Sequence, residues 1–324
     1  MQPAVQVSVG DTRLPGRGDL DISTFDATLQ KTSPQGGLLT RHPLVFYFLI
    51  AFAFSWLMFL PAVLTYYRVL NVSPSIVGLL GIVGLLGPVL SGFIMTAVTE
   101  GGAGVRRWLG RIVLWRVGLR WYLFAIIGLP LVMVLATIIV RPGALESFQT
   151  LAPLSVVPYL SAFVFMVLIG GPLFEEPGWS GFAQPHMQRL HGPLVGGIIL
   201  GSLWALWHLP GFLMPSEDLT DIPPRGTVLD FVVFALALIG LRLVIMWVFN
   251  NTKGSVLMAI LIHASWNTFY SAALIQLFPA PSVLGSYLNL TIAAGVLALA
   301  IIAMTRGRLG HRQEEEPDLA TTST

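Results

Sequence analysis

Long apolar stretches alternate with short polar ones along most of this chain. Eight apolar segments approach the roughly 20 residues that a membrane-spanning helix needs. They are expected at 44–67, 74–98, 120–140, 153–176, 193–214, 229–249, 255–277 and 286–305. The fourth is the least regular, because its apolar part ends at a pair of glutamates. The pattern predicts an all-α, polytopic membrane bundle of about eight transmembrane helices.

Polar sequence flanks this region on both sides. Residues 1–42 are mixed in charge and rich in Gly, Ser, Thr, Asp and Pro, without the short apolar core and cleavage site of a signal peptide. Residues 306–324 include a run of three glutamates. We therefore expect one membrane domain, residues 43–305, between disordered N- and C-terminal tails.

Composition agrees with a membrane protein. The 324 residues are 55% hydrophobic and 10% charged, with a mean hydropathy of +0.77, whereas soluble domains carry about 25% charged residues. The net charge of +2 gives no indication of a nucleic-acid partner. The chain has no cysteine, which excludes disulfides, thiolate metal sites and a cysteine nucleophile.

Basic residues are distributed unevenly over the predicted loops. If the N-terminus lies inside, fourteen of the 18 Lys and Arg residues fall on the inner side, three on the outer side, and Arg242 within a span. Because cytoplasmic loops carry the excess of Lys and Arg, both termini are predicted to be cytoplasmic. Residues 104–120 are basic with interleaved Trp, Leu, Ile and Val, which is typical either of an amphipathic helix on anionic lipid or of a plain basic loop.

Three polar islands interrupt the apolar segments. They are Glu175 and Glu176 in FEEPGWSGF, His208 in LWALWHLPG, and His263 with Asn267 in LIHASWNTF. An ionisable side chain at mid-bilayer costs roughly 2.5–3.5 kcal/mol on insertion scales. Such groups are rarely neutral additions to a membrane helix, so these islands are the candidate site.

Each island also has a simpler structural interpretation. Adjacent residues of a helix point about 100° apart, so one glutamate can face a site while the other meets a second partner; alternatively, the pair marks a helix end at the interface. His208 shares a helix face with Trp204 and could simply pack there. His263 and Asn267 also share a face, which suits either one site or an interhelical hydrogen bond.

Taken in order, FEEPGWSGF, WALWH and HASWN resemble the motifs of the CPBP family of intramembrane proteases, over about residues 150–275. This family includes the type II CAAX prenyl endopeptidases and the bacterial Abi proteins. Its pattern is Glu-Glu-x-x-x-Arg, then aromatic-x-x-x-His, then His-x-x-x-Asn or Asp. The resemblance implies an integral, multi-pass protein of a bacterial plasma membrane.

The resemblance also implies roles for the islands. Glu175 and His208 match the residues that activate the hydrolytic water, His263 and Asn267 match those that stabilise the oxyanion, and Glu176 matches the second acid. The implied activity is endopeptidase cleavage near the membrane. The implied partners are a peptide or protein substrate, prenylated in part of the family, and the lipid bilayer, with no nucleic acid.

The chain departs from the family pattern at Ser180, which stands where the motif has an arginine. Without that cation, a buried acid lacks its usual partner. Arg242 is the only Lys or Arg in the interior of a predicted span, away from its ends, and our hypothesis is that it reaches Glu176 from the sixth segment. The alternative is an arginine that extends to the membrane interface.

The residues alone leave the chemistry open. A glutamate and two histidines are a common catalytic zinc set, so Glu175, His208 and His263 would be the ligands if zinc is bound; a metal-free glutamate and histidine mechanism needs no cofactor. Two other classes of function compete with a protease. One is a non-catalytic scaffold or immunity-type membrane protein, which Ser180 favours, and the other is a transporter that uses the same buried polar groups.

Overall fold

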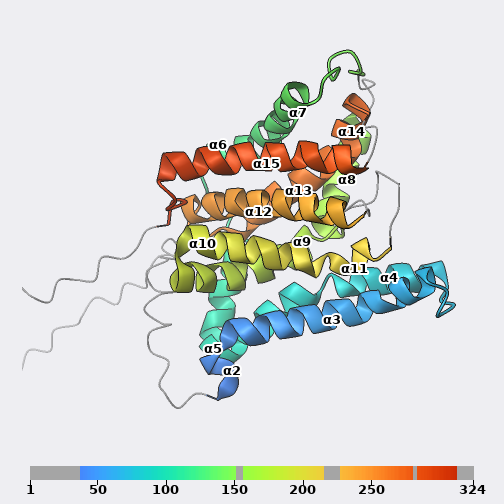
Figure 1. Ribbon diagram of the computed structural model, residues 1–324. Helices are drawn as coiled ribbons and strands as arrows, with labels where there is room; N and C mark the ends of the chain where they lie inside the picture. The colour runs from blue at the N-terminus through green and yellow to red at the C-terminus, as the bar shows by residue number, and fades with distance from the viewer. Residues whose placement is uncertain (1–36, 151–155, 215–226, 280–282, 312–324) are drawn as a thin grey trace, which may run out of the picture.

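The computed structural model describes residues 37–150, 156–214, 227–279 and 283–311. All regular structure within these ranges is helical (Figure 1). The helices are α2 (Leu38–Arg41), α3 (Pro43–Tyr66), α4 (Pro74–Gly84), α5 (Gly87–Ile112), α6 (Leu119–Leu123), α7 (Leu129–Val140), α8 (Val156–Leu168), α9 (Pro172–Gly178), α10 (Gln184–Trp207), α11 (Leu209–Phe212), α12 (Val228–Asn251), α13 (Val256–Phe269), α14 (Ile275–Leu277) and α15 (Val283–Thr305). Three π-helical turns join them: η1 (Phe124–Gly128), η3 (Trp179–Ala183) and η4 (Tyr270–Leu274).

The predicted fold class is confirmed. Within the described residues, 7 helical stretches are long and apolar enough to cross a membrane. They are Pro43–Tyr66, Pro74–Ile112, Leu119–Val140, Pro172–Trp207, Val228–Asn251, Val256–Leu277 and Leu284–Thr305. The eighth apolar helix is α8, whose 13 residues reach only about 20 Å at 1.5 Å per residue, short of a hydrocarbon core of about 30 Å.

The fourth and fifth predicted segments are divided differently in the structure. The fourth was expected to run through the glutamate pair, but α8 ends at Leu168 and α9 begins at Pro172. Gly171 between them has φ 114°, a conformation that favours glycine. From α9 the chain continues helically through η3 into α10, which bends at Gly192 with φ 72°. The glutamates therefore lie near the start of a long helical stretch and not at the end of one.

Most of both predicted tails, residues 1–36 and 312–324, lies outside the described residues. The described ends of these tails join the fold. Residues Leu38–Arg41 form α2. Leu309 is fully buried, and its carbonyl accepts a hydrogen bond from Asn250 Nδ2 at 2.9 Å.

Helix α12 lies at the centre of the bundle. Of the 18 most apolar consecutive residues of α12, 67% are buried. The share is the same for the Val256–Leu277 stretch and only 17% for α3. Helix α12 packs against α10 and α15 at small residues. A Cβ added to Gly240 would lie 2.9 Å from Ala294, and one added to Gly201 would lie 2.8 Å from Ile239. Small residues let membrane helices approach closely, so α12 can bring a long side chain into the interior beside α10.

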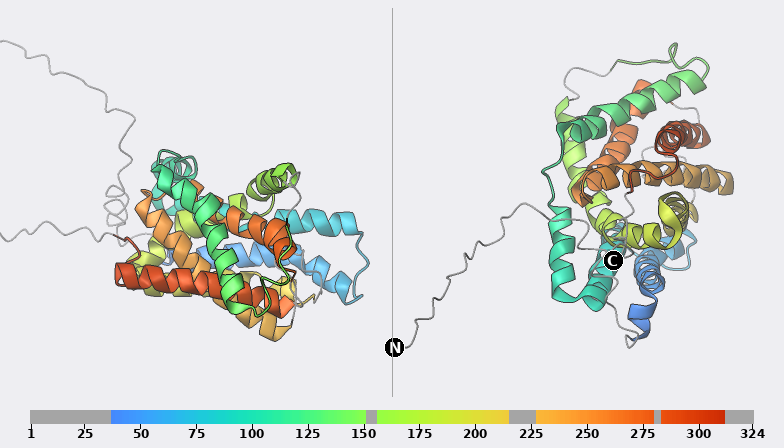
Figure 2. Two further views of the ribbon diagram at one scale, coloured as in Figure 1. Left: turned by 90° about the horizontal axis from the view of Figure 1, so that it is seen from above. Right: turned by 90° about the vertical axis from the view of Figure 1, so that its left-hand side faces the viewer.

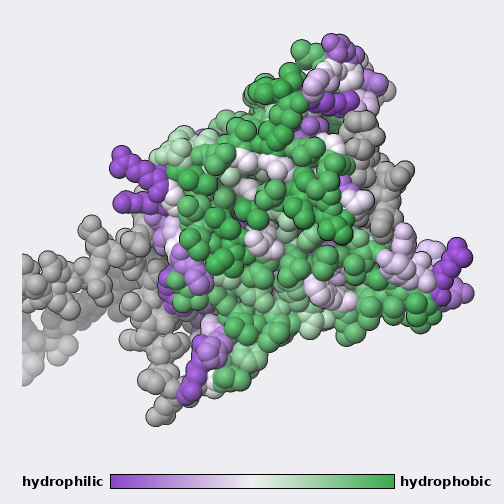
Figure 3. All heavy atoms as spheres, in the orientation of Figure 1, coloured by the Kyte–Doolittle hydropathy of each residue, from purple (hydrophilic) through white to green (hydrophobic). Residues whose placement is uncertain are grey.

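The outer surface is what a bilayer requires. Apolar side chains form a broad continuous region over the long helices, and hydrophilic residues gather towards the ends of the bundle (Figure 3). The chain is therefore an integral multi-pass membrane protein, with its polar islands inside the bundle and its apolar side chains outside.

Candidate active site

The position of the glutamate pair follows from the break in the helix before α9. Gly171 is the N-cap of α9, Pro172 is its first residue, and the amide of Glu175 donates to the carbonyl of Gly171 at 2.9 Å. A Cβ added to Gly171 would lie only 2.5 Å from Oε1 of Glu175. Glycine at this position therefore supplies both the turn and the space for the carboxylate.

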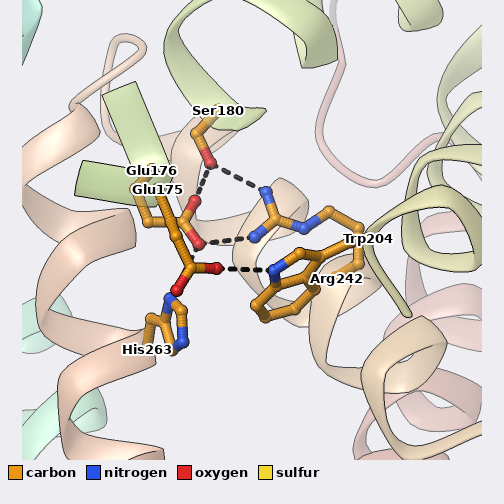
Figure 4. Close-up of polar contacts among 6 residues, drawn as sticks. All are labelled: Glu175, Glu176, Ser180, Trp204, Arg242 and His263. Atoms are coloured by element: carbon orange, nitrogen blue, oxygen red, sulfur yellow. Dashed lines mark hydrogen bonds and ion pairs between the residues drawn. The ribbon is translucent and has the colours of Figure 1, made fainter. Parts of the chain in front are cut away.

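The two carboxylates point to different partners, as predicted for neighbours on a helix (Figure 4). Glu175 is 4% exposed, and its Oε2 accepts a hydrogen bond from Trp204 Nε1 at 2.7 Å. Glu176 is fully buried and contacts Arg242, Ser180 and His263. One acid is therefore fixed by a network of several groups, whereas the other is held by a single indole N–H.

The predicted contact between Arg242 and Glu176 is confirmed. Arg242 Nη2 lies 2.6 Å from Glu176 Oε1, and both side chains are fully buried. Nη1 of the same guanidinium donates to Ser180 Oγ at 2.9 Å, and that hydroxyl in turn donates to Glu176 Oε2. Ser180 thus connects the acid to the cation that replaces the motif arginine.

The guanidinium also lies over an aromatic ring. Its central carbon is 4.6 Å from the centroid of Trp204, within the range of a cation–π contact. Trp204 therefore contacts Glu175 through its N–H, and contacts Arg242, the cation that pairs with Glu176, through its ring face. The sequence predicted only that it shares a face with His208.

His263 is oriented by Glu176. Its Nδ1 lies 3.1 Å from Glu176 Oε1. Because a carboxylate paired with Arg242 can only accept, Nδ1 carries the proton in this contact. Nε2 is then the nitrogen left for other chemistry. The imidazole packs edge-on against Trp204, with ring centroids 5.0 Å apart.

His208 is oriented by a backbone carbonyl. Its Nδ1 lies 2.9 Å from the carbonyl oxygen of Trp204, one helical turn earlier. A carbonyl oxygen only accepts, so Nδ1 donates and Nε2 of a neutral ring is an acceptor. His208 is half-buried at the end of α10, against Trp207 and Phe234. Its Nε2 is therefore suited to take a proton.

Asn267 lies one turn after His263 on α13 and is half-buried. Its backbone carbonyl accepts from Ser271 Oγ at 2.9 Å. No hydrogen bond reaches its carboxamide from the residues that the structure describes. The amide can therefore donate to a bound molecule without breaking a protein contact.

The candidate zinc ligands do not form a ligand set as they stand. Within the described ranges, no three His, Asp or Glu side chains lie together in a way that could hold a metal ion. Glu175 accepts from an indole, and His263 is directed at Glu176. Zinc binding by Glu175, His208 and His263 stays a prediction.

One residue that touches this site was not predicted from the sequence. Trp108 of α5 is 5% exposed, and its Nε1 donates to the carbonyl of Pro177 at 2.9 Å, directly after Glu176 in the chain. The only sequence signal was a tryptophan within the basic segment 104–120. Because tryptophan is common in such segments, it gave no reason to expect an inward contact.

Comparison with known proteins agrees with this geometry. Residues 157–269 match the family described as type II CAAX prenyl endopeptidase Rce1-like. This segment resembles that family. It contains the glutamate pair, His208, His263 and Asn267, so the predicted resemblance is confirmed where the motifs lie. The chain is also 22% identical, over 220 residues, to a CAAX prenyl protease 2 of Methanococcus maripaludis; the match covers 67% of this chain and 80% of the relative. These similarities support an intramembrane protease.

Proposed function

We propose that this protein is an intramembrane endopeptidase in which Glu175 and His208 activate water while His263 and Asn267 stabilise the oxyanion. The observation that carries the proposal is the difference in hydrogen-bond partners between the two glutamates. Glu176 is fixed by Arg242, Ser180 and His263, whereas Glu175 has one protein donor. A carboxylate held by a single donor keeps lone pairs for a water molecule.

The first step takes a proton from water. Glu175, with His208 Nε2 as the second acceptor, receives that proton, and the resulting hydroxide attacks the peptide carbonyl carbon. The π electrons of the carbonyl move onto its oxygen to give a tetrahedral oxyanion. Both acceptors adjoin Trp204: its indole N–H donates to Glu175, and its backbone carbonyl accepts from His208. A water beside this tryptophan would therefore suit the step.

The second step returns the proton. The oxyanion collapses, the C–N bond breaks, and the leaving nitrogen takes the proton held by Glu175 or His208, so that the products are a carboxylic acid and an amine. Donors at the oxyanion lower the barrier. Asn267 can donate as it stands. His263 can donate when Nε2 also carries a proton, in which case both of its ring nitrogens are donors.

The substrate we propose is a peptide or protein segment near the membrane surface, with a prenylated peptide as the first to test. This choice rests on the CAAX names of the matched family and the archaeal relative. The lipid bilayer would then hold both enzyme and substrate. A matched peptide without the prenyl group would separate recognition of the lipid from recognition of the peptide.

The test is cleavage of a quenched fluorescent peptide by purified protein in nanodiscs. Glu175→Gln keeps the shape of the side chain but removes the base, so we expect turnover to fall by about 10²- to 10⁴-fold. Glu146→Gln is the matched control, because Glu146 is an exposed glutamate outside the site. Wild-type cleavage by Glu175→Gln would show that the base is another residue. If no peptide is cleaved by the native protein, the non-catalytic scaffold becomes the better interpretation.

A further inference from the structure

Helix α5 changes direction at Gly101. This residue has φ 65° and ψ −164°, which separates residues 87–100 from residues 102–112. We call residues 102–112 the crosswise helix. In the right-hand view of Figure 2 α3 and α15 are seen nearly end-on, whereas the crosswise helix is seen from its side. It therefore lies across one end of the bundle, in the plane that a membrane surface would occupy.

The inner side of this element contacts α9, the helix that carries the glutamate pair. Trp108 donates to the carbonyl of Pro177 in α9. It also packs against η3, where a Cβ added to Gly181 would lie 2.9 Å from its Nε1. Just beyond the crosswise helix, the carbonyl of Leu114 accepts from Ser255 Oγ at 2.7 Å, and Ser255 is the N-cap of α13.

The outer side combines basic and large apolar side chains. The exposed residues from 102 to 120 include Arg106, Leu109, Val113, Trp115, Arg116, Leu119 and Arg120. Trp115 is 61% exposed, and the Arg116 guanidinium lies 5.3 Å from its ring centroid. Interleaved arginine, tryptophan and leucine at one surface are typical of an element that lies in the headgroup region.

Charge favours one kind of lipid. The only acid between residues 100 and 120 is Glu100, and it is already neutralised by Arg107 at 2.9 Å, with its side chain 3% exposed. The exposed arginines therefore face outward without acidic neighbours along this segment. A surface of this charge complements anionic phospholipid headgroups.

We propose that residues 102–120 bind anionic phospholipid headgroups, and that this docking holds α9 and α13 in their working arrangement through the Trp108–Pro177 and Ser255–Leu114 hydrogen bonds. The binding surface stands on its own geometry; its effect on cleavage rests on the proposed function. Anionic lipid would then affect the glutamate pair through the Pro177 carbonyl, which follows Glu176 in the chain, and not by contact with the reacting groups.

The binding surface is tested by amide hydrogen exchange in nanodiscs with increasing phosphatidylglycerol in phosphatidylcholine. We expect phosphatidylglycerol to slow exchange in peptides from residues 102–120. Each arginine near an anionic surface contributes about fivefold in binding, so Arg116→Gln with Arg120→Gln should weaken the response by roughly 25-fold. Arg306→Gln with Arg308→Gln is the matched control, because it removes the same charge from exposed positions after α15 and should respond like the native protein.

Two results would overturn the binding surface. One is exchange in residues 102–120 that does not depend on phosphatidylglycerol in the native protein. The other is an equal loss of response in both double variants, which would indicate a general effect of surface charge. Neither measurement needs cleavage, so a failure of the proposed activity would not be mistaken for a failure of this proposal.

The coupling is tested with Trp108→Phe, which keeps an aromatic ring and removes the N–H donor. In the native protein, phosphatidylglycerol should slow exchange in residues 172–183 and raise kcat with little change in KM. In Trp108→Phe, residues 102–120 should still be protected, whereas residues 172–183 and kcat should no longer respond. A variant in which residues 172–183 respond to phosphatidylglycerol as in the native protein would overturn the coupling, whether or not a cleaved peptide has been found.

Discussion

Arg242 on α12 supplies the positive charge that pairs with Glu176 of the glutamate motif on α9. The guanidinium and the Glu176 carboxylate are both fully buried, and Ser180 lies between them as a small hydrogen-bonding link. Removing one partner of such a buried pair typically costs about 3–5 kcal/mol, because the other charge is left without compensation. The pair is therefore more informative about the site than any exposed ion pair in the chain.

We expect Arg242→Ala to destabilise the folded protein by about 3–5 kcal/mol and to abolish cleavage, because His263 loses an ionised, fixed acceptor. Ser180→Arg in the Arg242→Ala background should recover part of both losses, since it returns a cation to the same acid. Thermal unfolding in nanodiscs and peptide cleavage measure the two effects.

The single variant Ser180→Arg completes this cycle. With Arg242 still present, a second guanidinium would compete for one carboxylate in a packed interior, so the single variant should be less stable than the native protein. If Ser180→Arg alone were harmless and gave no recovery in the double variant, the two positions would not share a role.

At the scale of elements, α9 is held in place by close backbone packing. A Cβ added to Gly178 would overlap the carbonyl of Pro88 in α5 and lie 2.7 Å from the Tyr47 hydroxyl of α3. The short helix with the glutamate pair is thus pressed against two longer helices. Glycine is needed at this position for contact distance, not for a special backbone angle.

Gly178→Ala should therefore push α9 away from α5 and cost about 1–3 kcal/mol, which is typical of overpacking a tight interior. Gly295→Ala is the control, because a Cβ there meets nothing within 4 Å and the position is helical. Thermal unfolding of both variants makes the comparison. Equal stability of the two would mean that α9 and α5 can separate without cost.

Sequence patterns predicted the fold class well, but not the boundaries that matter most for the candidate site. Apolar length predicted the helical bundle. Polar islands within apolar runs indicated the candidate site residues, whose catalytic roles stay predictions. The break at Gly171 was missed because hydropathy does not register a backbone angle. Contacts across the chain, such as Trp204 with Glu175, depend on how helices rotate in the bundle, and spacing along one helix carries no information about that. Arg242 was an exception, since an isolated buried cation near an unpaired acid has few possible partners.

At the scale of the whole molecule, membrane orientation is still a prediction. The distribution of Lys and Arg favours a cytoplasmic location for both termini. A reporter fused after Thr324 should read cytoplasmic, and one inserted within residues 215–226, which lie outside the described residues, should read external. Signals on the reverse sides would show that the orientation is wrong. Termini on opposite sides would agree with the 7 long spans alone and would mean that α8 does not cross the membrane.

Metal content is a second property of the whole protein. If Glu175, His208 and His263 bind zinc, the purified protein should contain about one zinc per chain, and a strong chelator should stop cleavage until the metal is restored. Elemental analysis of the native protein, with His208→Ala as the comparison, makes the measurement. Full activity at negligible metal content would mean that only the metal-free glutamate and histidine mechanism remains.

The position of Arg242 in the chain has a consequence for how the protein is made. Glu176 and its cation are separated by 66 residues, so a growing chain delivers the acid to the membrane well before α12 is synthesised. In a protein with the motif arginine, the charge would be balanced within one turn of the same helix. Here the acid must wait, protonated or hydrated, at a cost of roughly 2.5–3.5 kcal/mol at mid-bilayer, until α12 inserts beside it. Chains truncated before α12 should therefore insert less well than chains that include it.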